Sequence, residues 1–338
     1  MDIKTLGIDL AKNVFQMHGV DAQGKVVLRK RISRSDLANF VLNLPPCLIG
    51  MESCGGANYW ARKSQSYGHE VKIMNPQFVK PYVKSNKNDR NDSEAICEAV
   101  TRPNMRFVSV KQIAQQDMQM LHRIRSQLVA NRTAVANQIR GFLSEYGIVF
   151  PMQIQNVRKE LPQIIDDTNN ELSEFSRGLF RELQEDLVTL DKRIDACEAK
   201  IKALFKSNEQ CQRISEIEGI GMITATALVS AIGDPKTFKD GRELSAWLGL
   251  VPKQASSGGK TLLLGISKRG DRYLRALLIH GARSVVCRAS NKKDKRSQWI
   301  NDIRYRGGMN KACVALANKN ARIVWALLAH NAEYRKAA

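Results

Sequence analysis

The sequence lacks the features that mark a membrane protein, a zinc protein or a disulfide-stapled secreted protein. No apolar run approaches the roughly 20 residues that cross a bilayer, and no segment has the pattern of a signal peptide. The seven cysteines are scattered, with neither a C-x-x-C pair nor a Cys/His spacing typical of zinc ligands. An odd number of unpatterned cysteines fits a reducing compartment. We therefore expect a soluble, cytoplasmic protein.

Acidic residues are also scarce relative to basic ones. The chain has 53 Lys or Arg against 33 Asp or Glu, a formal charge of +20 at pH 7. Residues 250–338 alone carry 19 Lys or Arg and four acids, a net charge of +15. Such asymmetry indicates binding to a phosphate backbone that weakens as salt rises. A generic basic protein or a ribosome-associated factor is the alternative. The length of 338 residues allows two domains with ample core.

Two of the acids stand where strands are expected to end. Asp9 and Glu52 lie at or just beyond the ends of two short apolar runs, residues 3–8 and 47–51, which predict buried strands. If these strands are neighbours in one sheet, both acids emerge at the same sheet edge. Taken singly, each acid also fits a turn residue, a helix cap or a solvated charge.

A second pair of acids opens a predicted helix. Asp89 and Asp92 are three residues apart, so they share one face of that helix. Carboxylates that converge repel each other and lose solvation unless a cation neutralises them. Oxygen-only ligands suit Mg²⁺ or Mn²⁺, which hold phosphates for in-line displacement.

The expected elements around these acids follow the ribonuclease H order. Three strands form an antiparallel meander, and a helix and then alternating strands and helices follow. That fold commonly places acids at these sheet positions around two metals. The expected strands are residues 3–8, 14–20, 26–32, 47–51 and 70–74, and the expected helices are residues 35–44 and 58–67.

A long helical middle follows. Apolar residues recur at helical spacing from Leu121 to Tyr146 and again from Leu172 to Leu204, with a Pro-containing break near residues 150–162. This pattern predicts an antiparallel helical hairpin or a coiled coil. The apolar stripe either packs only against itself or contacts a second protomer.

The sequence pattern changes at residues 214–233, where short helices replace the long helical stripes. Gly219-Ile220-Gly221, between two short predicted helices, resembles a helix-hairpin-helix turn, in which glycine amides and a helix N-terminus approach a DNA phosphate. Plain helix–helix packing is the alternative for these glycines.

A sharper pattern is the pair Ser256-Ser257 before Gly258-Gly259. It places a hydroxyl on an exposed loop with basic neighbours. Serine becomes a nucleophile only when a base, a metal or a positive field activates it and the phosphate is held in line. The nearest histidine in the sequence is His280, so a hydrolase-type triad is poorly supported. A phosphate-binding or disordered loop is the alternative.

Several other residues complete the candidates. Possible phosphate contacts, which a solvated face explains nearly as well, are Lys12, Lys260, Lys268, Arg269 and Arg272. We expect Glu94 to be a solvated or capping residue. Three aromatic residues at helical spacing are expected in the core rather than stacked on nucleotides: Trp299, Tyr305 and Trp325.

Two sets of motifs together point to a known family. The first set is GIDLAK, MESCGG and NDRNDSEA; the second is IEGIGMITA, LSAWLGLVP, SSGGK, ISKRGD and LANKNARIVWALL. With these motifs in this order around a helical insert, the chain resembles, nearly end to end, the DEDD transposases of bacterial insertion sequences. That group includes Piv-type DNA invertases and bridge-RNA-guided recombinases.

The resemblance implies an α/β plus α architecture in three parts. A RuvC-like domain with the ribonuclease H fold would span residues 1–112. A helical hairpin or coiled-coil region for dimerisation would span residues 113–207. A basic, mostly helical transposase domain with the serine loop would span residues 208–338.

The resemblance also implies roles for individual residues. The residues at its DEDD positions, which would bind Mg²⁺ or Mn²⁺, are Asp9, Glu52, Asp89 and Asp92. Ser257 stands where the family has its nucleophile, with Ser256 as the rival. The serine would attack a DNA phosphate and form a phosphoserine intermediate, and the metal would polarise the phosphoryl oxygen. In this family the acids and the serine meet in a composite site across protomers.

The implied partners are donor DNA, target DNA and a noncoding guide (bridge) RNA from the same element. The protein would be a homodimer, with a tetramer in the synaptic complex, in the bacterial cytoplasm and at the nucleoid when active. Two other classes stay open. One is a RuvC-like endonuclease or junction resolvase in which water attacks. The other is a non-catalytic nucleic-acid-binding protein whose acids are structural.

Overall fold

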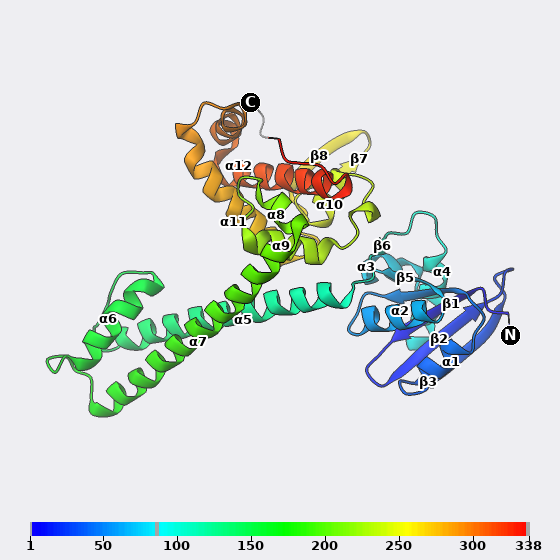
Figure 1. Cartoon of the computed structure of the whole chain (residues 1–338), viewed down its shortest axis with the longest axis horizontal. Coiled ribbons are helices and arrows are strands. Elements are labelled where there is room, and N and C mark those ends of the chain that lie inside the picture. Colours follow the sequence, from blue (N-terminus) through cyan, green and yellow to red (C-terminus); the bar gives the residue numbers. More distant parts are fainter. Residues whose placement is uncertain (1, 85–87, 336–338) are drawn as a thin grey trace. The chain divides into compact units, whose positions relative to one another are not determined.

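The computed structural model describes residues 2–84 and 88–335, which divide into two compact units (Figure 1). Unit 1 comprises Met1–Gln116 with Ile232–Lys239, and unit 2 comprises Asp117–Ala231 with Asp240–Ala338. Within the described ranges, no helix combines the length and the apolar character needed to cross a membrane. The expected three-part division at residues 112 and 207 stays a prediction.

Unit 1 is built on a six-stranded mixed sheet with the order β3-β2-β1-β4-β5-β6. The first three strands form the expected antiparallel meander, β4 and β5 run parallel to β1, and β6 is antiparallel to β5. The strands are β1 Thr5–Leu10, β2 Val14–Val20, β3 Val26–Ser33, β4 Leu48–Glu52, β5 Glu70–Met74 and β6 Phe107–Val108. This mixed sheet is consistent with the expected ribonuclease H-like domain.

Helices cover both faces of this sheet. The helices of unit 1 are α1 Leu37–Leu42, α2 Ala57–Ser66, α3 Pro76–Val79 and α4 Asp89–Val100, with short 3₁₀ turns at Lys80–Tyr82 and Pro235–Thr237. Helices α1 and α2 pack on the face that carries Phe15 and Met17. Helix α4 packs on the opposite face, where β1 and β4 carry glycines in place of side chains.

The two glycines bring α4 against the backbone of the sheet. A Cβ on Gly7 would collide with Ser93 O and lie 2.5 Å from Cys97 N. A Cβ on Gly50 would lie 2.9 Å from the side chain of Val100. Because real Cβ contacts do not come this close, only glycine at these positions permits the observed approach of α4.

Unit 2 is mostly helical. Its elements are α5 Ile113–Ser144 (which begins in unit 1), α6 Ile154–Asp166, α7 Glu174–Ser207, α8 Glu209–Ser215, α9 Met222–Ile232, α10 Gly241–Trp247, β7 Pro252–Ser257, β8 Lys260–Ile266, α11 Arg272–Arg288, a 3₁₀ turn at Ala289–Asn291, and α12 Lys295–Ala329. Helix α12 is interrupted at Gly308, whose φ of 80° is not helical. The strands β7 and β8 form a two-stranded antiparallel hairpin.

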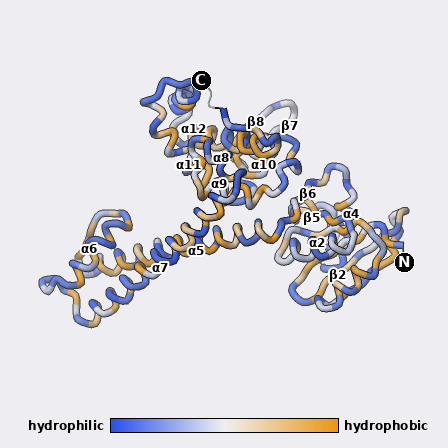
Figure 2. The backbone as a smooth tube through the Cα atoms, viewed as in Figure 1, coloured by the Kyte–Doolittle hydropathy of each residue, from blue (hydrophilic) through white to orange (hydrophobic). Residues whose placement is uncertain are grey.

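Helices α5 and α7 form an antiparallel pair over the stretch where a hairpin or coiled coil was expected. Their apolar stripes face each other, and hydrophobic and hydrophilic segments alternate along both helices (Figure 2). Arg132 on α5 pairs with Asp191 on α7 at 3.0 Å, and Arg125 Nε donates to Glu198 at 2.9 Å. The residue of lower number on α5 pairs with the residue of higher number on α7, as expected for antiparallel helices. A supercoiled coiled coil is not confirmed.

The expected break near residues 150–162 is wrong in extent, because α6 occupies most of it. Val157, Leu161 and Ile165 recur every four residues and are buried between α5 and α7. The burial of this apolar stripe overrides the helix-breaking tendency of Pro162 inside α6. At this end the hairpin is therefore a three-helix bundle.

A buried histidine links three helices of unit 2. His122 on α5 contacts the Tyr273 hydroxyl at 3.1 Å through Nδ1 and Thr226 Oγ1 at 3.0 Å through Nε2. The Thr226 hydroxyl donates to Met222 O, so it accepts from His122 Nε2–H, and Nδ1 accepts from Tyr273. Burial, with a smaller contribution from Arg125, lowers the pKa of His122 from 6.5 to about 4.

Replacing Gly7 by Ala tests the contact of α4 with β1. The added methyl group meets backbone atoms, which cannot rotate away, so we expect a loss of roughly 3 kcal/mol in the free energy of unfolding. Urea unfolding measures this loss. In the control Gly55→Ala, the methyl group meets nothing within 4 Å, and the change should stay within about 0.5 kcal/mol. Equal effects of the two substitutions would contradict the proposed contact.

The His122 network predicts a pH-dependent stability. Between pH 6.5 and about 4 only the unfolded chain protonates this histidine, so its stabilising effect is complete above pH 6.5 and is lost as pH falls. The stability difference between wild type and His122→Gln should shrink by roughly 3 kcal/mol from pH 7 to pH 4, measured by urea unfolding. A constant difference for His122→Gln would show that His122 is not buried in its neutral form.

Candidate active site

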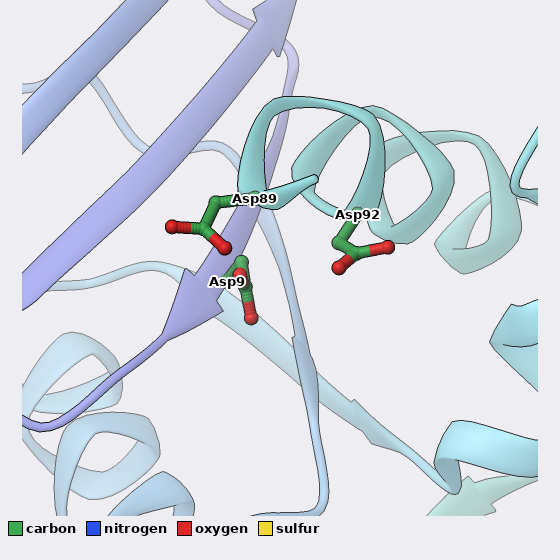
Figure 3. Close-up of side chains that lie close together, drawn as sticks. All are labelled: Asp9, Asp89 and Asp92. Carbon is green, nitrogen blue, oxygen red and sulfur yellow. The ribbon is translucent and has the colours of Figure 1, made fainter. Parts of the chain in front are cut away.

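Three carboxylates converge in unit 1. Each of Asp9, Asp89 and Asp92 offers an oxygen, and these oxygens lie within 4.8 Å of one another. Asp9 comes from the end of β1, and the other two come from the first turn of α4 (Figure 3). Asp9 and Asp92 are half-buried, and Asp89 is exposed. Among the described residues, this group has the spacing that a metal ion needs.

The start of α4 explains the position of its two acids. Asn88 caps the helix, because its side-chain oxygen accepts a hydrogen bond from Asn91 N at 2.8 Å. Asp89 and Asp92 then lie in the first helical turn, where the positive end of the helix dipole favours negative charge. The close contact of α4 with β1 at Gly7 brings this turn to Asp9, two residues further along the strand.

Glu52 lies beside Asp9 in the sheet, although it is outside the group of three. β1 and β4 are parallel, with Gly7 opposite Gly50, so the same register continued by two residues brings Asp9 beside Glu52. Residues two apart on a strand share a face. Asp9 and Glu52 therefore lie on the α4 face, as the two glycines do.

The surroundings of Cys54 agree with this placement. Burial raises the pKa of the Cys54 thiol, and the negative charges of Asp9 and then Glu52 raise it further. Both carboxylates therefore lie close to the same thiol. The Cys54 sulfur lies 3.8 Å from Leu10 O, at the end of β1.

The donor set fits a hard divalent cation. All of its atoms are carboxylate oxygens, and its half-exposed position leaves room for water and a phosphate. Three carboxylates this close repel one another, and a cation between them relieves that repulsion. The four acids expected from the sequence are thus brought to one region of unit 1, three of them in direct proximity.

Sequence reasoning missed a polar cluster beside these acids. Glu94, expected to be a solvated or capping residue, reaches back to the sheet: its Oε2 lies 3.7 Å from Arg29 Nη2 and 3.9 Å from His18 Nδ1. His18 is buried, and burial lowers its pKa while Glu94 opposes the shift. The strand register could have revealed this cluster, because His18 on β2 pairs with Gly7 on β1 and with Arg29 on β3. This cluster ties α4 to β2 and β3.

The predicted serine loop is a tight β-hairpin in unit 2. Ser257 is the last residue of β7, and Gly258 and Gly259 turn the chain with φ of 54° and 74°. Positive φ at both central positions is the requirement of a type I′ turn, which glycine meets without strain. Ser257 pairs with Lys260 across the turn, and both side chains are exposed.

The two serines of the hairpin point to opposite faces, because side chains alternate along a strand. Ser256 pairs with Thr261, and its hydroxyl oxygen accepts a hydrogen bond from Gln254 Nε2 at 2.9 Å. Ser257 shares its face with Lys260 instead. A positive neighbour therefore accompanies Ser257 and not Ser256.

The base of the hairpin is held by contacts that sequence reasoning did not find. A Cβ on Gly249 would collide with Arg269 O, and one on Gly270 would collide with Trp247 O, so the two loops interlock through their backbones. The buried Arg275 donates to Leu248 O at 3.2 Å. The motifs LGLVP and ISKRGD thus form one support beneath β7 and β8.

The remaining predicted contact residues are at the surface, apart from one glycine. The cations Lys12, Lys260, Lys268, Arg269 and Arg272 are all exposed. Gly221 is open to solvent, whereas Gly219 lies against α11, where a Cβ would lie 2.9 Å from Gly281 O. Helix packing therefore accounts for Gly219.

The three aromatic residues that were expected in the core differ in burial. Trp299 and Trp325 are half-buried. The expectation of a core position is wrong for Tyr305, which is 93% exposed. It lies just before the interruption of α12 at Gly308, where the helical spacing no longer predicts a buried face.

A ribonuclease H-like sheet with clustered carboxylates, joined to a basic helical unit, defines an enzyme of nucleic-acid phosphate chemistry. Comparison with known proteins narrows this class. Residues 6–148 match the DEDD transposase family of the IS110 type, and residues 211–298 match the family described as Transposase IS116/IS110/IS902.

Relatives match the chain over nearly its whole length. It is 48% identical to a probable family 20 transposase of Pseudomonas aeruginosa, with 99% of each chain covered. It is 48% identical to the transposase for insertion sequence element IS1111A of Coxiella burnetii, over 99% of this chain and 92% of that protein. It is 42% identical to the transposase for IS1328 of Yersinia enterocolitica, with 99% of each covered. The chain belongs to the IS110/IS116 family of DEDD transposases, enzymes that cleave and rejoin DNA.

Proposed function

We propose that this insertion-sequence transposase cuts and rejoins donor and target DNA with Ser257 as nucleophile and a divalent metal at Asp9, Glu52, Asp89 and Asp92. The observation that carries the proposal is the convergence of three of these carboxylates at the end of β1, with the fourth beside them in register. Residues from three separate parts of the sequence meet there.

The carboxylates would hold Mg²⁺ or Mn²⁺. Their role is to supply oxygen ligands from a rigid sheet and a fixed helix turn, so that the ion's position is set before substrate arrives. When bound, the ion polarises a phosphoryl oxygen and neutralises charge that develops there. The cluster of Glu94, His18 and Arg29 keeps α4, and with it two of the ligands, against the sheet.

Ser257 would attack a DNA phosphate. A bond forms between its Oγ and phosphorus, the bond to one strand's oxygen breaks, and that strand leaves with a free hydroxyl. The phosphoserine linkage retains the bond energy, so the strand can be rejoined without an external energy source. Lys260, opposite Ser257 in the hairpin, would bind the phosphate and favour the deprotonated serine.

A noncoding RNA from the same element would choose the DNA sites by base pairing. The net charge of +15 on residues 250–338 supports a role in holding nucleic acid. The protein would recognise the RNA by shape and backbone, while base pairing supplies the sequence choice. The exposed cations and Gly221 are the proposed contacts on this surface, together with Lys12 in unit 1.

The helical pair α5 and α7 would join protomers into a dimer, and two dimers would form the synaptic tetramer. Large apolar side chains stay exposed there, including Phe175 at 78%, Phe142 at 48% and Leu179 at 45%. Exposed apolar side chains of this size are typical of protein contact sites. They favour a protomer contact over a stripe that packs only against itself.

The test uses the protein with Mg²⁺, the flanking noncoding RNA and labelled donor and target DNA, followed by a denaturing gel. We expect a protein–DNA adduct with the wild type and with Ser256→Ala, and no adduct with Ser257→Ala. Asp9→Asn should reduce the adduct by roughly 100-fold or more, because the developing charge loses its metal.

Other outcomes would change the assignment. Adduct loss only in Ser256→Ala would transfer the nucleophile to that serine. Metal-dependent cleavage without any adduct would establish the water-using nuclease, for which the carboxylate cluster alone suffices. Neither cleavage nor adduct, with DNA still bound, would favour a non-catalytic binding protein.

A further inference from the structure

Unit 2 contains a groove of about 1250 Å³ at the foot of the serine hairpin, here called the α12 groove. Its floor is α12, and one wall is the start of β7 and the end of β8. The residues that line it include Lys311, Lys319, Arg322, Trp299, Arg242 and Leu264. The groove exceeds the roughly 300–1,000 Å³ of a typical small-molecule pocket. Its size fits a stretch of polymer better.

The groove is strongly basic. Four cations line it against a single acid, Asp240. Lys311, Lys319 and Arg322 are exposed and lie at positions that share one face of the helix. Small residues at 315 and 326 stand on the same stripe, so a bound chain can approach the helix backbone.

Two of the groove cations, Lys319 and Arg322, influence each other. Burial of part of its side chain lowers the pKa of Lys319, and the charges of Arg296 and then Arg322 lower it further. Like charges held together in this way are relieved when an anion binds among them. The charge pattern therefore selects a polyanion as the occupant.

Aromatic side chains accompany the charges. The Lys319 ammonium lies 4.4 Å from the ring centroid of Trp299, and the half-buried Trp299 and Trp325 both line the groove. A cationic groove with aromatic rings is the usual architecture for binding a single nucleic-acid strand, in which phosphates meet cations and bases meet rings.

The groove is continuous with the hairpin. Leu264 lines the groove, and Lys260, the partner of Ser257, lies four residues earlier on β8. At about 3.3 Å per residue, β8 spans roughly 13 Å between Lys260 and Leu264. A nucleic-acid strand bound in the groove therefore lies a few nucleotides from the Ser257 hydroxyl.

We propose that the α12 groove binds a single DNA strand that flanks the phosphate attacked by Ser257. Its phosphates lie along Lys311, Lys319 and Arg322, and one base lies against Trp299. This inference rests on the proposed role of Ser257 for the identity of the strand as DNA. The groove itself, its charge and its aromatic lining do not depend on that role.

The first test measures binding of a fluorescein-labelled single-stranded DNA from the element end by anisotropy at several salt concentrations. In the triple variant Lys311→Gln/Lys319→Gln/Arg322→Gln, we expect a roughly 10- to 100-fold weaker affinity near 0.1 M salt and a salt slope smaller by about 2. The matched control Arg181→Gln/Lys192→Gln/Lys202→Gln removes three exposed charges from α7. Equal affinities and slopes for the two variants would overturn the proposal.

The second test identifies the strand. Full-length Ser257→Ala protein is assembled with guide RNA, donor and target DNA, with 5-iodouracil at successive positions near the cleavage site in the DNA or in the RNA. Irradiation should crosslink the DNA within a few nucleotides of the cleavage site to the peptide that contains Trp299, and Trp299→Leu should lose the crosslink. A crosslink from RNA alone, or DNA crosslinks only elsewhere in the chain, would overturn the assignment.

The crosslink and the adduct experiment test the groove and the serine mechanism independently. The crosslink needs no reaction at Ser257, so it survives if the adduct experiment shows hydrolysis by water. Conversely, a Ser257 adduct without a Trp299 crosslink would leave the mechanism standing and remove the groove from the DNA path. The groove cations are exposed, so melting temperatures of the triple variant and its control should match the wild type and exclude misfolding.

Discussion

The contact of α4 with the bare backbone of β1 is the constraint on which the candidate site depends. Gly7 leaves no side chain between the helix and the strand, so the first turn of α4 comes down beside the end of β1. Asp89 and Asp92 then meet Asp9, and the parallel register of β4 adds Glu52. A larger residue at position 7 would lift the helix and separate the acids. The contacts of Glu94 with His18 and Arg29 also hold α4 against the sheet.

In unit 2, glycines also allow a close backbone contact, here between two loops beneath the hairpin. Glycines at 249 and 270 let two loops interlock beneath the hairpin, and Arg275 binds the loop carbonyls. The hairpin above them has no such cover, and its residues are almost all exposed. A rigid base with an exposed tip suits the proposed nucleophile Ser257, which must reach a phosphate of the nucleic-acid backbone. The α12 groove begins where this rigid base ends.

Much of unit 1 could be predicted from apolar runs and turn residues. The strands at 14–20 and 70–74 match in full, whereas β1 is shifted by two residues because Ile3 is buried without joining the strand. The four candidate acids could be named from their positions at the ends of predicted elements. Their separation could not, because it depends on how close α4 approaches the sheet. Burial of α6 between two helices overrode Pro162, and the cluster at Glu94 required the strand register.

The most direct test of the account is the anomalous diffraction of Mn²⁺ in crystals of the full-length protein. We expect one or more peaks bound by oxygens of Asp9, Asp89 and Asp92, at roughly the 2.0–2.6 Å typical of hard divalent ions. The peaks should vanish in Asp9→Asn crystals of the same form. Well-ordered carboxylates with no peak among them, or Mn²⁺ bound elsewhere in the chain, would contradict the central claim that this cluster is the metal site.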